Sequence, residues 1–539
     1  MSRRTWNNAP ALLLIGLLVG EPVALGVESD LPGSTGSAPE TMQPEETTLR
    51  LELAQAERAH DLNILSSRMR LGLFLWRRGQ SAEARSLFER VREVADTQVR
   101  PDESARVLAT GFLAVLDYEE GNLSAARRLA QEAVPLVSQL SQKSDVSQLA
   151  VELGRMLISD GAPSKAEPLL RYAYAFDSNA AAAVHSEQSS ADLTRLHSRA
   201  ALELARWSAG ELRGQKATDL LAESITTLST LGSAETQDLA RQRLAFGDIL
   251  IAARLYGNAE HHLRTAIELY SHVPINMRAG EIDCWAALGH LYMRQQQWSE
   301  AQEAYTQALA LRQKRSGENH WQAALLKYRV GYTLLTLKDS ASALPLLDSS
   351  VKWFTQNVGS EDVYTSYARY GLALAYYTSA QEGEAEPLLV KSVEAQRSHP
   401  QDHELEGAAL VLGEIRAANG RKAEALELYE LSWKGYERRS EPSSDYVRSA
   451  MRLGQLRLEY SNLPGAQEVL ERAYAHRDLA EPADRALTVY LLRSTHLQQR
   501  DGVDVADYDR ELRRVCGGRP PDLYTTQVCA VMVQDVEMR

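Results

Sequence analysis

The strongest constraint on the fold of this chain is a spacing that recurs ten times between residues 71 and 466. In each copy a small residue follows a large apolar one, and an alanine stands twelve residues later. The small residues are Gly72, Ala114, Gly154, Ala205, Gly247, Gly289, Gly331, Ala373, Gly413 and Gly454, and the alanines are Ala84, Ala126, Ala166, Ala217, Ala259, Ala301, Ala343, Ala385, Ala425 and Ala466. Most copies are about 42 residues apart, and one interval is 51 residues long. Repeats at such a period indicate a solenoid that is built from stacked copies of one unit.

Each copy predicts two helices that are joined by a turn. Four residues after the alanine stands a large apolar or aromatic residue in nine of the ten copies, and three residues further on stands Val, Ala or Ser. Steps of four and three residues stay on one face of a helix. The small residues allow the two helices to approach closely, and copies must stack because one copy cannot bury its own apolar face.

The pattern is most complete in the copy that carries Trp285, Leu288, Gly289, Tyr292, Ala301, Tyr305 and Ala308. In this order it resembles the tetratricopeptide repeat, and the longer period resembles the kinesin-light-chain subtype. The resemblance covers about residues 60–480. It implies an all-α, right-handed superhelical solenoid of about ten helix pairs, with first helices that line a concave groove and bind another protein or a peptide.

Two features depart from the resemblance. At four positions where the first helix of the family carries Tyr or Leu, this chain has a polar residue. These residues are Asp117, Ser208, Arg416 and Arg457. The 51-residue interval holds about nine extra residues within 177–192, which predict a longer loop or an extra turn of helix.

The N-terminus predicts a secretory signal at residues 1–26. Arg3 and Arg4 precede the apolar run 11–20, and small residues for a signal peptidase stand at Ala24 and Gly26. The run is too short to cross a bilayer comfortably, so the cleaved chain would have no membrane span and would be periplasmic or secreted. An uncleaved anchor is the alternative. Residues 27–47 are rich in Pro, Gly, Ser, Thr and Glu, which predicts a disordered linker.

The repeat array is predicted at residues 48–480, beginning with a helix at 48–60. A capping helix at 484–500 and a tail are expected within 481–539. Cys516 and Cys529 flank a Gly- and Pro-rich turn, and in an oxidising compartment they could form a disulfide. Two free thiols on a loose tail are the alternative.

Charge and motifs exclude several classes of function. The formal net charge of -13 argues against a nucleic-acid partner. No phosphate-binding, nucleophile or metal-ligand motif is complete, so we expect no enzyme activity, no cofactor and no metal site. An active site in the C-terminal tail is the alternative, but so short a segment cannot form a separate core without staples.

One face of the predicted first helices combines basic and aromatic residues. Arg155, Arg199, Arg206 and Arg241 are expected on this face in the third to fifth copies, His290 and Met293 in the sixth, and Tyr328, Tyr332, Tyr367, Tyr370 and Tyr377 in the seventh and eighth. Arginine binds carboxylates in a bidentate manner, and tyrosine is favoured at interfaces. We therefore predict a groove for a peptide or protein segment with acidic and apolar residues.

Three other interpretations of this face remain open. The arginine and tyrosine side chains could pair and pack within the array. The groove could bind carbohydrate during the assembly of an envelope polysaccharide. If the N-terminal signal is not used, the chain could be a cytoplasmic regulatory sensor.

Overall fold

The computed structural model of the chain describes residues 44–59, 63–97, 102–141, 143–176, 187–210, 214–229, 236–252, 254–273, 278–398, 406–438, 442–516, 529–530 and 532. The predicted signal at 1–26 and most of the predicted linker lie outside these residues. Helix α2 (Pro44–Ala59) begins four residues before the predicted start of the array at Thr48. The early start follows from Pro44 with Glu45 and Glu46, because Pro and acidic residues favour the first turn of a helix.

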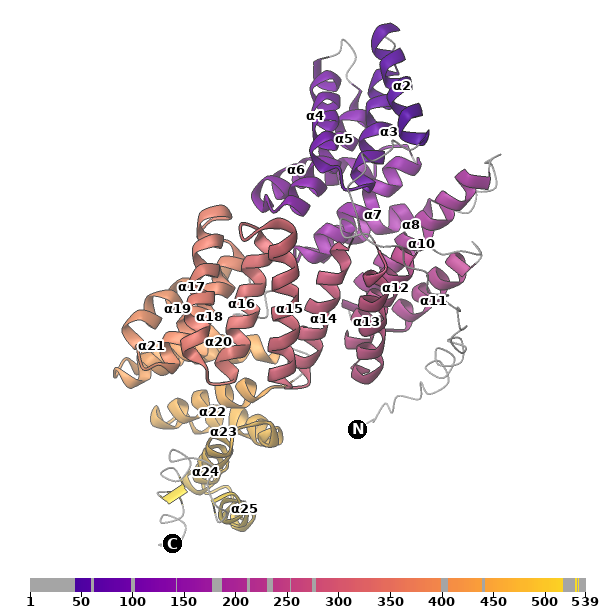
Figure 1. Cartoon of the computed structure of the whole chain (residues 1–539). Coiled ribbons are helices and arrows are strands. Elements are labelled where there is room, and N and C mark those ends of the chain that lie inside the picture. The colour runs from indigo at the N-terminus through magenta and orange to yellow at the C-terminus, as the bar shows by residue number, and fades with distance from the viewer. Residues whose placement is uncertain are drawn as a thin grey trace, which may run out of the picture. The chain divides into compact units, whose positions relative to one another are not determined.

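Ten helix pairs follow α2, and no strand occurs in the described residues (Figure 1). The pairs are α3 (Ile64–Arg77) with α4 (Ser81–Thr97), α5 (Glu103–Glu120) with α6 (Leu123–Val137), α7 (Ser144–Ser159) with α8 (Pro163–Ala175), α10 (Glu187–Gly210) with α11 (Gly214–Ser229), α12 (Thr236–Ala252) with α13 (Tyr256–Ser271), α14 (Ala279–Arg294) with α15 (Trp298–Ser316), α16 (Trp321–Thr336) with α17 (Ser340–Asn357), α18 (Val363–Thr378) with α19 (Glu382–Ser398), α20 (Glu406–Ala418) with α21 (Lys422–Glu437), and α22 (Ser444–Glu459) with α23 (Leu463–Ala475). Each pair packs on the next, so the chain is an all-α solenoid, as the spacing predicts.

The close approach of paired helices explains the small residue of each copy. A Cβ atom on Gly247 of α12 would lie 2.4 Å from Leu263 of α13, and one on Gly331 of α16 would lie 2.6 Å from Leu347 of α17. The apolar residue four positions after the alanine therefore fills the space that a side chain on the first helix would occupy. All ten repeat alanines are 0% exposed, which makes this contact the repeating core of the array.

Serine replaces alanine in some copies at the third core position of the second helix. Ser350 Oγ donates a hydrogen bond of 2.7 Å to the carbonyl of Ala324, and Ser392 Oγ donates one of 3.2 Å to the carbonyl of Ser366. In both copies the bond reaches back 26 residues to the first helix. The buried hydroxyl is thus satisfied, and it links the two helices of its pair.

The described turns inside the pairs share a left-handed residue. It stands seven positions after the small residue in every such turn that the structure describes, at Gly79, Gly121, Gly161, Arg254, Gln296, Lys338, Ala380, Gly420 and Ser461. The backbone N–H of the following residue donates a hydrogen bond to a carbonyl of the first helix, as Asp339 does to Leu334 at 2.9 Å. This arrangement caps the helix end, although five of the nine residues are not glycine.

The two departures in the sequence also have structural outcomes. Helix α10 is 24 residues long, so part of the inserted segment adds helix, and residues 177–186 lie outside the described residues. At the polar positions of three first helices, ion pairs reach back to the second helix of the preceding pair. They join Asp117 to Arg85 at 2.8 Å, Arg416 to Glu386 at 2.7 Å and Arg457 to Glu430 at 3.2 Å.

The C-terminal end of the array is covered by helices α24 (Pro482–Gln499) and α25 (Ala506–Cys516), after a short 3-10 helix η2 (Arg477–Leu479). Cys516 and Cys529 form a disulfide, with their Cα atoms 5.4 Å apart. Cys529 and Met532 are buried in a cluster with Val489 of α24 and Leu512 of α25. The disulfide thus joins Cys529 to α25, beside the apolar cluster of the two terminal helices.

Within the described residues, one set of contacts joins units that are far apart in the sequence. We call it the seam, and it consists of Tyr118, Arg127, Asp160, His320, Trp321, Asp362 and Tyr364. The Trp321 indole donates a hydrogen bond of 3.1 Å to the carbonyl of Tyr118, and the two rings are 4.9 Å apart. Arg127 pairs with both Asp160, at 2.9 Å, and Asp362. The second and third helix pairs therefore contact the seventh and eighth.

Candidate functional site

Side chains of consecutive first helices meet along one surface, which we call the first-helix face. Its polar members are Glu119, Glu152, Arg155, Arg199, Glu203, Arg206, Asp238, Arg241, Asp248 and Asp283, and its aromatic members are Tyr332, Tyr367 and Tyr377. The four predicted arginines lie here, as the helical spacing requires. The six carboxylates were not among the residues that the sequence analysis selected.

The arginines of this face are held by carboxylates from neighbouring helices. Arg155 donates hydrogen bonds of 3.0 Å to Glu152 and 3.2 Å to Glu119, so it connects α7 with α5. Burial alone would lower the pKa of Arg155, but Glu152 and Glu119 outweigh it and raise the pKa above its ordinary value. The arginines predicted a basic surface in this part of the first-helix face. That prediction is wrong, because acidic residues neutralise the arginines.

The same arrangement continues into the fourth and fifth pairs. Arg206 donates a hydrogen bond of 3.1 Å to Glu203 on its own helix and one of 3.0 Å to Asp248 on α12. Arg199 donates one of 2.8 Å to Asp238, which lies 3.8 Å from Arg241. Ion pairs thus fix the side-chain positions from α5 to α12 along this face.

The carboxylates of this face are enclosed by protein although solvent reaches them. The side chains of Glu119 and Asp248 are 37% and 30% exposed. Burial nevertheless raises the pKa of both carboxyl groups, against the opposing effect of Arg155 on Glu119 and of Arg206 on Asp248. The two observations together describe a recessed polar surface rather than an open one.

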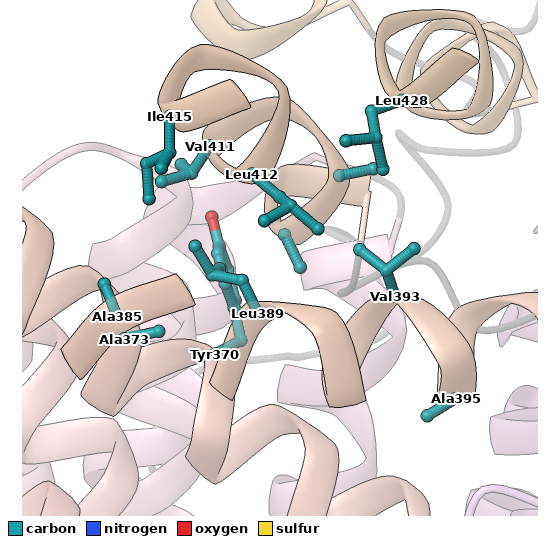
Figure 2. Packing of buried hydrophobic residues seen from close by; sticks show 12 residues of the cluster. Tyr370, Ala373, Ala385, Leu389, Val393, Ala395, Val411, Leu412, Ile415 and Leu428 are labelled. Carbon is teal, nitrogen blue, oxygen red and sulfur yellow. The ribbon is translucent and has the colours of Figure 1, made fainter. Parts of the chain in front are cut away.

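The five predicted tyrosines separate into two groups. Tyr328 and Tyr370 are 3% and 7% exposed and belong to the core between neighbouring pairs. Figure 2 shows the Tyr370 ring beside Leu389 and Val411 of its apolar cluster. A Cβ atom on Gly407 would lie 2.0 Å from the Tyr370 hydroxyl oxygen, so this ring fills the space that α20 leaves open. The interpretation of packing within the array therefore applies to these two residues.

The side chains of the other three tyrosines are partly exposed to solvent. Tyr332 and Tyr367 are half-buried beside the apolar cluster of α16 to α18. The Tyr377 hydroxyl donates a hydrogen bond of 3.3 Å to Glu414, which also accepts from Arg448 and Arg452 of α22. An ion-pair network therefore borders the aromatic part of the first-helix face, and its acidic member Glu414 was missed because it stands alone among apolar neighbours in the sequence.

The two residues predicted between these regions lie on α14. His290 is exposed, and Met293 is half-buried and accepts a hydrogen bond from the Tyr305 hydroxyl at 3.4 Å. In the parts of the chain that the structure describes, no group of acidic, histidine and cysteine side chains is arranged to hold a metal ion, and no helix is both long and apolar enough to cross a membrane.

Comparisons with known proteins agree with this architecture. Sequence profiles of the tetratricopeptide repeat match residues 64–95, in the first pair, and residues 284–318, in the sixth. No curated protein sequence matches the chain.

Solved structures of helical repeat proteins are similar to the chain. The apo form of RapI is 12% identical, with 73% of this chain and 99% of that chain covered and a TM-score of 0.47. A Rap protein complexed with competence and sporulation factor is 15% identical, with coverages of 72% and 100% and a TM-score of 0.43. Repeats of a putative kinesin light chain from Podosopora anserina are 20% identical, with coverages of 39% and 98% and a TM-score of 0.34.

Both profile matches coincide with helix pairs that carry a small residue and a buried alanine at the same spacing as the other eight pairs. The chain therefore contains tetratricopeptide repeats.

Proposed function

We propose that this chain is an exported interaction scaffold that binds a peptide or protein segment along the first-helix face. The observation that carries the proposal is that the arginines on that face are both partly exposed and held by carboxylates. Arg155 and Arg241 are 32% and 39% exposed although carboxylates already fix their positions. A guanidinium has five N–H donors, so a paired arginine keeps donors for a ligand. Donors that are already fixed lose little entropy when a ligand binds.

The tyrosines next to this polar surface support a segment with apolar as well as polar groups. Tyr332, Tyr367 and Tyr377 are half-buried, and an aromatic ring offers a large contact area at low entropic cost. Because the arginines are neutralised within the chain, the partner need not be acidic overall. The proposed ligand is a segment that alternates hydrogen-bonding groups with apolar side chains.

The test is a selection of peptides with the chain that begins at Val27. Peptides from a random display library would be synthesised, and their dissociation constants would be measured by calorimetry. The double variant Tyr332→Ala and Tyr377→Ala is expected to weaken binding by about tenfold or more, as for aromatic residues at the centre of an interface. The matched control is Tyr460→Ala, since Tyr460 is an exposed tyrosine at the C-terminal end of α22.

Equal binding by the double variant and the control would contradict the proposed location. Binding of polysaccharides in place of peptides, lost in the same double variant, would favour the carbohydrate alternative.

Export has a separate test, which is the N-terminus of the protein purified from its native source. The proposal expects the chain to begin at Val27. An intact N-terminus at Met1 would support the cytoplasmic sensor instead, without affecting the groove.

A further inference from the structure

A cavity of about 440 Å³ lies between the second helices α4 and α6, and α5 contributes to its lining. Cavities that bind small molecules have volumes of about 300–1,000 Å³. The apolar part of the lining consists of Leu113 of α5 and Leu129 of α6, and every other side chain that lines the cavity carries a charge. None of these residues belongs to the first-helix face, so the cavity is separate from the binding surface proposed above.

Ion pairs show how the two walls of the cavity are placed. Arg85, in the first two turns of α4, donates hydrogen bonds of 2.8 Å to Asp117 and 2.7 Å to Glu120, at the end of α5 that leads into α6. Arg92, two turns further along α4, donates one of 3.2 Å to Glu132 of α6. Helices α4 and α6 therefore run in the same direction, and the pair of Arg92 with Glu132 joins the two walls.

One turn earlier on both helices, the corresponding ion pair is not made. Glu89 stands three residues before Arg92, and Arg128 stands four residues before Glu132. Residues at these spacings are neighbours on one helix face, and both Glu89 and Arg128 line the cavity and are exposed. Neither side chain forms an ion pair with any residue that the structure describes. The cavity thus has an unpaired anion on the α4 wall and an unpaired cation on the α6 wall.

The α4 wall carries more negative charge than its helix favours. Glu93 also lines the cavity without an ion pair among the described residues, and it stands four residues after Glu89. Like charges at this spacing destabilise a helix. Asp96 lines the cavity in the last turn of α4, where no basic residue stands and where the helix dipole disfavours an anion. A ligand that brings a cation to this wall would reduce both unfavourable effects.

We propose that this cavity binds a free amino acid with an apolar side chain. The carboxylate of the ligand accepts hydrogen bonds from Arg128, and its ammonium group donates hydrogen bonds to Glu89 and Glu93. Its side chain lies against Leu113 and Leu129. A ligand with a single charge would leave one wall unpaired, so the arrangement selects a molecule that carries both charges a short distance apart.

The first test uses L-leucine as the probe and calorimetry with the purified chain. Neutral pH and low ionic strength are required, because salt screens interactions between exposed charges. Leucinamide, which lacks the carboxylate, and 4-methylpentanoate, which lacks the ammonium group, are the matched ligands. We expect saturable binding of leucine and binding of the other two that is weaker by about tenfold or more. Absence of leucine binding, or equal binding of leucine and either matched ligand, would overturn the proposal.

The second test assigns the two charges to residues. Arg128→Gln and the double variant Glu89→Gln with Glu93→Gln should each weaken leucine binding by about tenfold or more. Arg90→Gln is the matched control, because Arg90 is an exposed arginine of α4 that does not line the cavity. Arg128→Gln should also bind leucine and leucinamide equally, which a merely structural role of Arg128 would not produce. Leucine binding by Arg128→Gln that equals binding by the control would overturn the proposal.

The cavity and the first-helix face can be tested independently. The double variant Tyr332→Ala and Tyr377→Ala should bind leucine as tightly as the original chain, since neither tyrosine lines the cavity. Loss of leucine binding in this variant would contradict the location proposed here. Peptide binding by Arg128→Gln should be unchanged, so failure of the amino-acid site would leave the proposed function standing.

Discussion

The repeating contacts of the helix pairs and the contacts of the seam hold the chain together in different ways. In each pair a small residue on the first helix receives an apolar side chain from the second, 16 residues further on, as Gly247 receives Leu263. Among the residues that the structure describes, the seam occurs once, and it joins residues more than 200 positions apart, as Trp321 with Tyr118. Loss of one repeating contact therefore weakens one pair, whereas loss of the seam removes the coupling between the second and eighth pairs.

The comparison also bears on cooperativity. A repeat protein that has only contacts between neighbours is described by the stability of each unit and of each interface. The seam adds a long-range interaction to that description, so it should bring distant units into one unfolding transition. The predictions below separate the two kinds of contact, from the largest expected effect to the smallest.

Truncation of Trp321 should have the largest effect. The Trp321→Ala variant removes a buried indole that contacts Tyr118 and Tyr364, and we expect a loss of about 3–5 kcal/mol in the free energy of unfolding. Urea unfolding followed by circular dichroism would measure it, and the transition should become broader or split into two. A change below 1 kcal/mol with a single unchanged transition would show that the seam is not a stabilising contact.

The seam should also make stability depend on pH through His320. The His320 Nδ1 accepts a hydrogen bond of 3.1 Å from the Gln322 N–H, and Nε2 lies 2.9 Å from the carbonyl of Glu119, to which it donates. Burial lowers the pKa of His320 to about 4, so the folded chain resists the proton that the unfolded chain takes up near pH 6.5. The stabilisation is complete above pH 6.5 and is lost as the pH falls to about 4, by up to about 3 kcal/mol.

The His320→Asn variant isolates this contribution. Asparagine can still cap α16, but it does not titrate, so unfolding free energies between pH 7 and 4 should fall less steeply than in the original chain. His262, whose pKa burial also lowers to about 4, remains in both proteins and cancels in the comparison. Parallel pH curves for the two proteins would assign the pH dependence to groups outside the seam.

Overpacking one repeating contact should have a smaller effect. Gly247→Val places side-chain atoms where Leu263 packs, and we expect a loss of about 1–3 kcal/mol. Gly257→Ala is the matched control, because a Cβ atom on Gly257 of α13 would meet nothing within 4 Å. The control should be neutral or slightly stabilising in the same urea titration. Equal losses in both variants would show that the contact with Leu263 does not account for the effect.

The smallest effect is expected at the turns. Ala380 has a φ of 57°, a left-handed conformation that glycine adopts more easily. Ala380→Gly should therefore stabilise the eighth pair by about 0.5–1 kcal/mol, and Gly420→Ala, at a φ of 76°, should destabilise the ninth by a similar amount. Thermal unfolding midpoints that move in the same direction for both variants would contradict this account of the turns.

Periodicity in the sequence predicts the repeating contacts but not the seam. A spacing such as that between Gly247 and Ala259 is enough to place the helices, the turn and the buried face of a copy, because the two helices pack in the same way in every copy. Trp321 has no counterpart in the other copies, so nothing in its local sequence indicates a contact with Tyr118. The turns were predicted, but in copies without glycine the local sequence does not indicate which residue is left-handed, as at Lys338, because tertiary packing imposes that conformation.

The candidate site could be predicted only in part. Helical spacing places Arg155 and Arg241 on the first-helix face, but their carboxylate partners come from other helices and have no fixed distance in sequence. Tyr328 and Tyr370 both stand three residues before the small residue of their copy, whereas Tyr367 stands six residues before it. The small neighbours Gly371 and Gly407 leave room for the two buried rings. Reading such neighbours together with the tyrosines would have distinguished the two groups.

The seam also has a mechanical consequence. When a pulling force acts on the two ends of the array, the ion pair of Arg127 with Asp362 and the contact of Trp321 with Tyr118 are loaded before the helix pairs between them. Opening these contacts would release the intervening folded units at once, so the array should stay stiff up to a threshold force and become compliant above it.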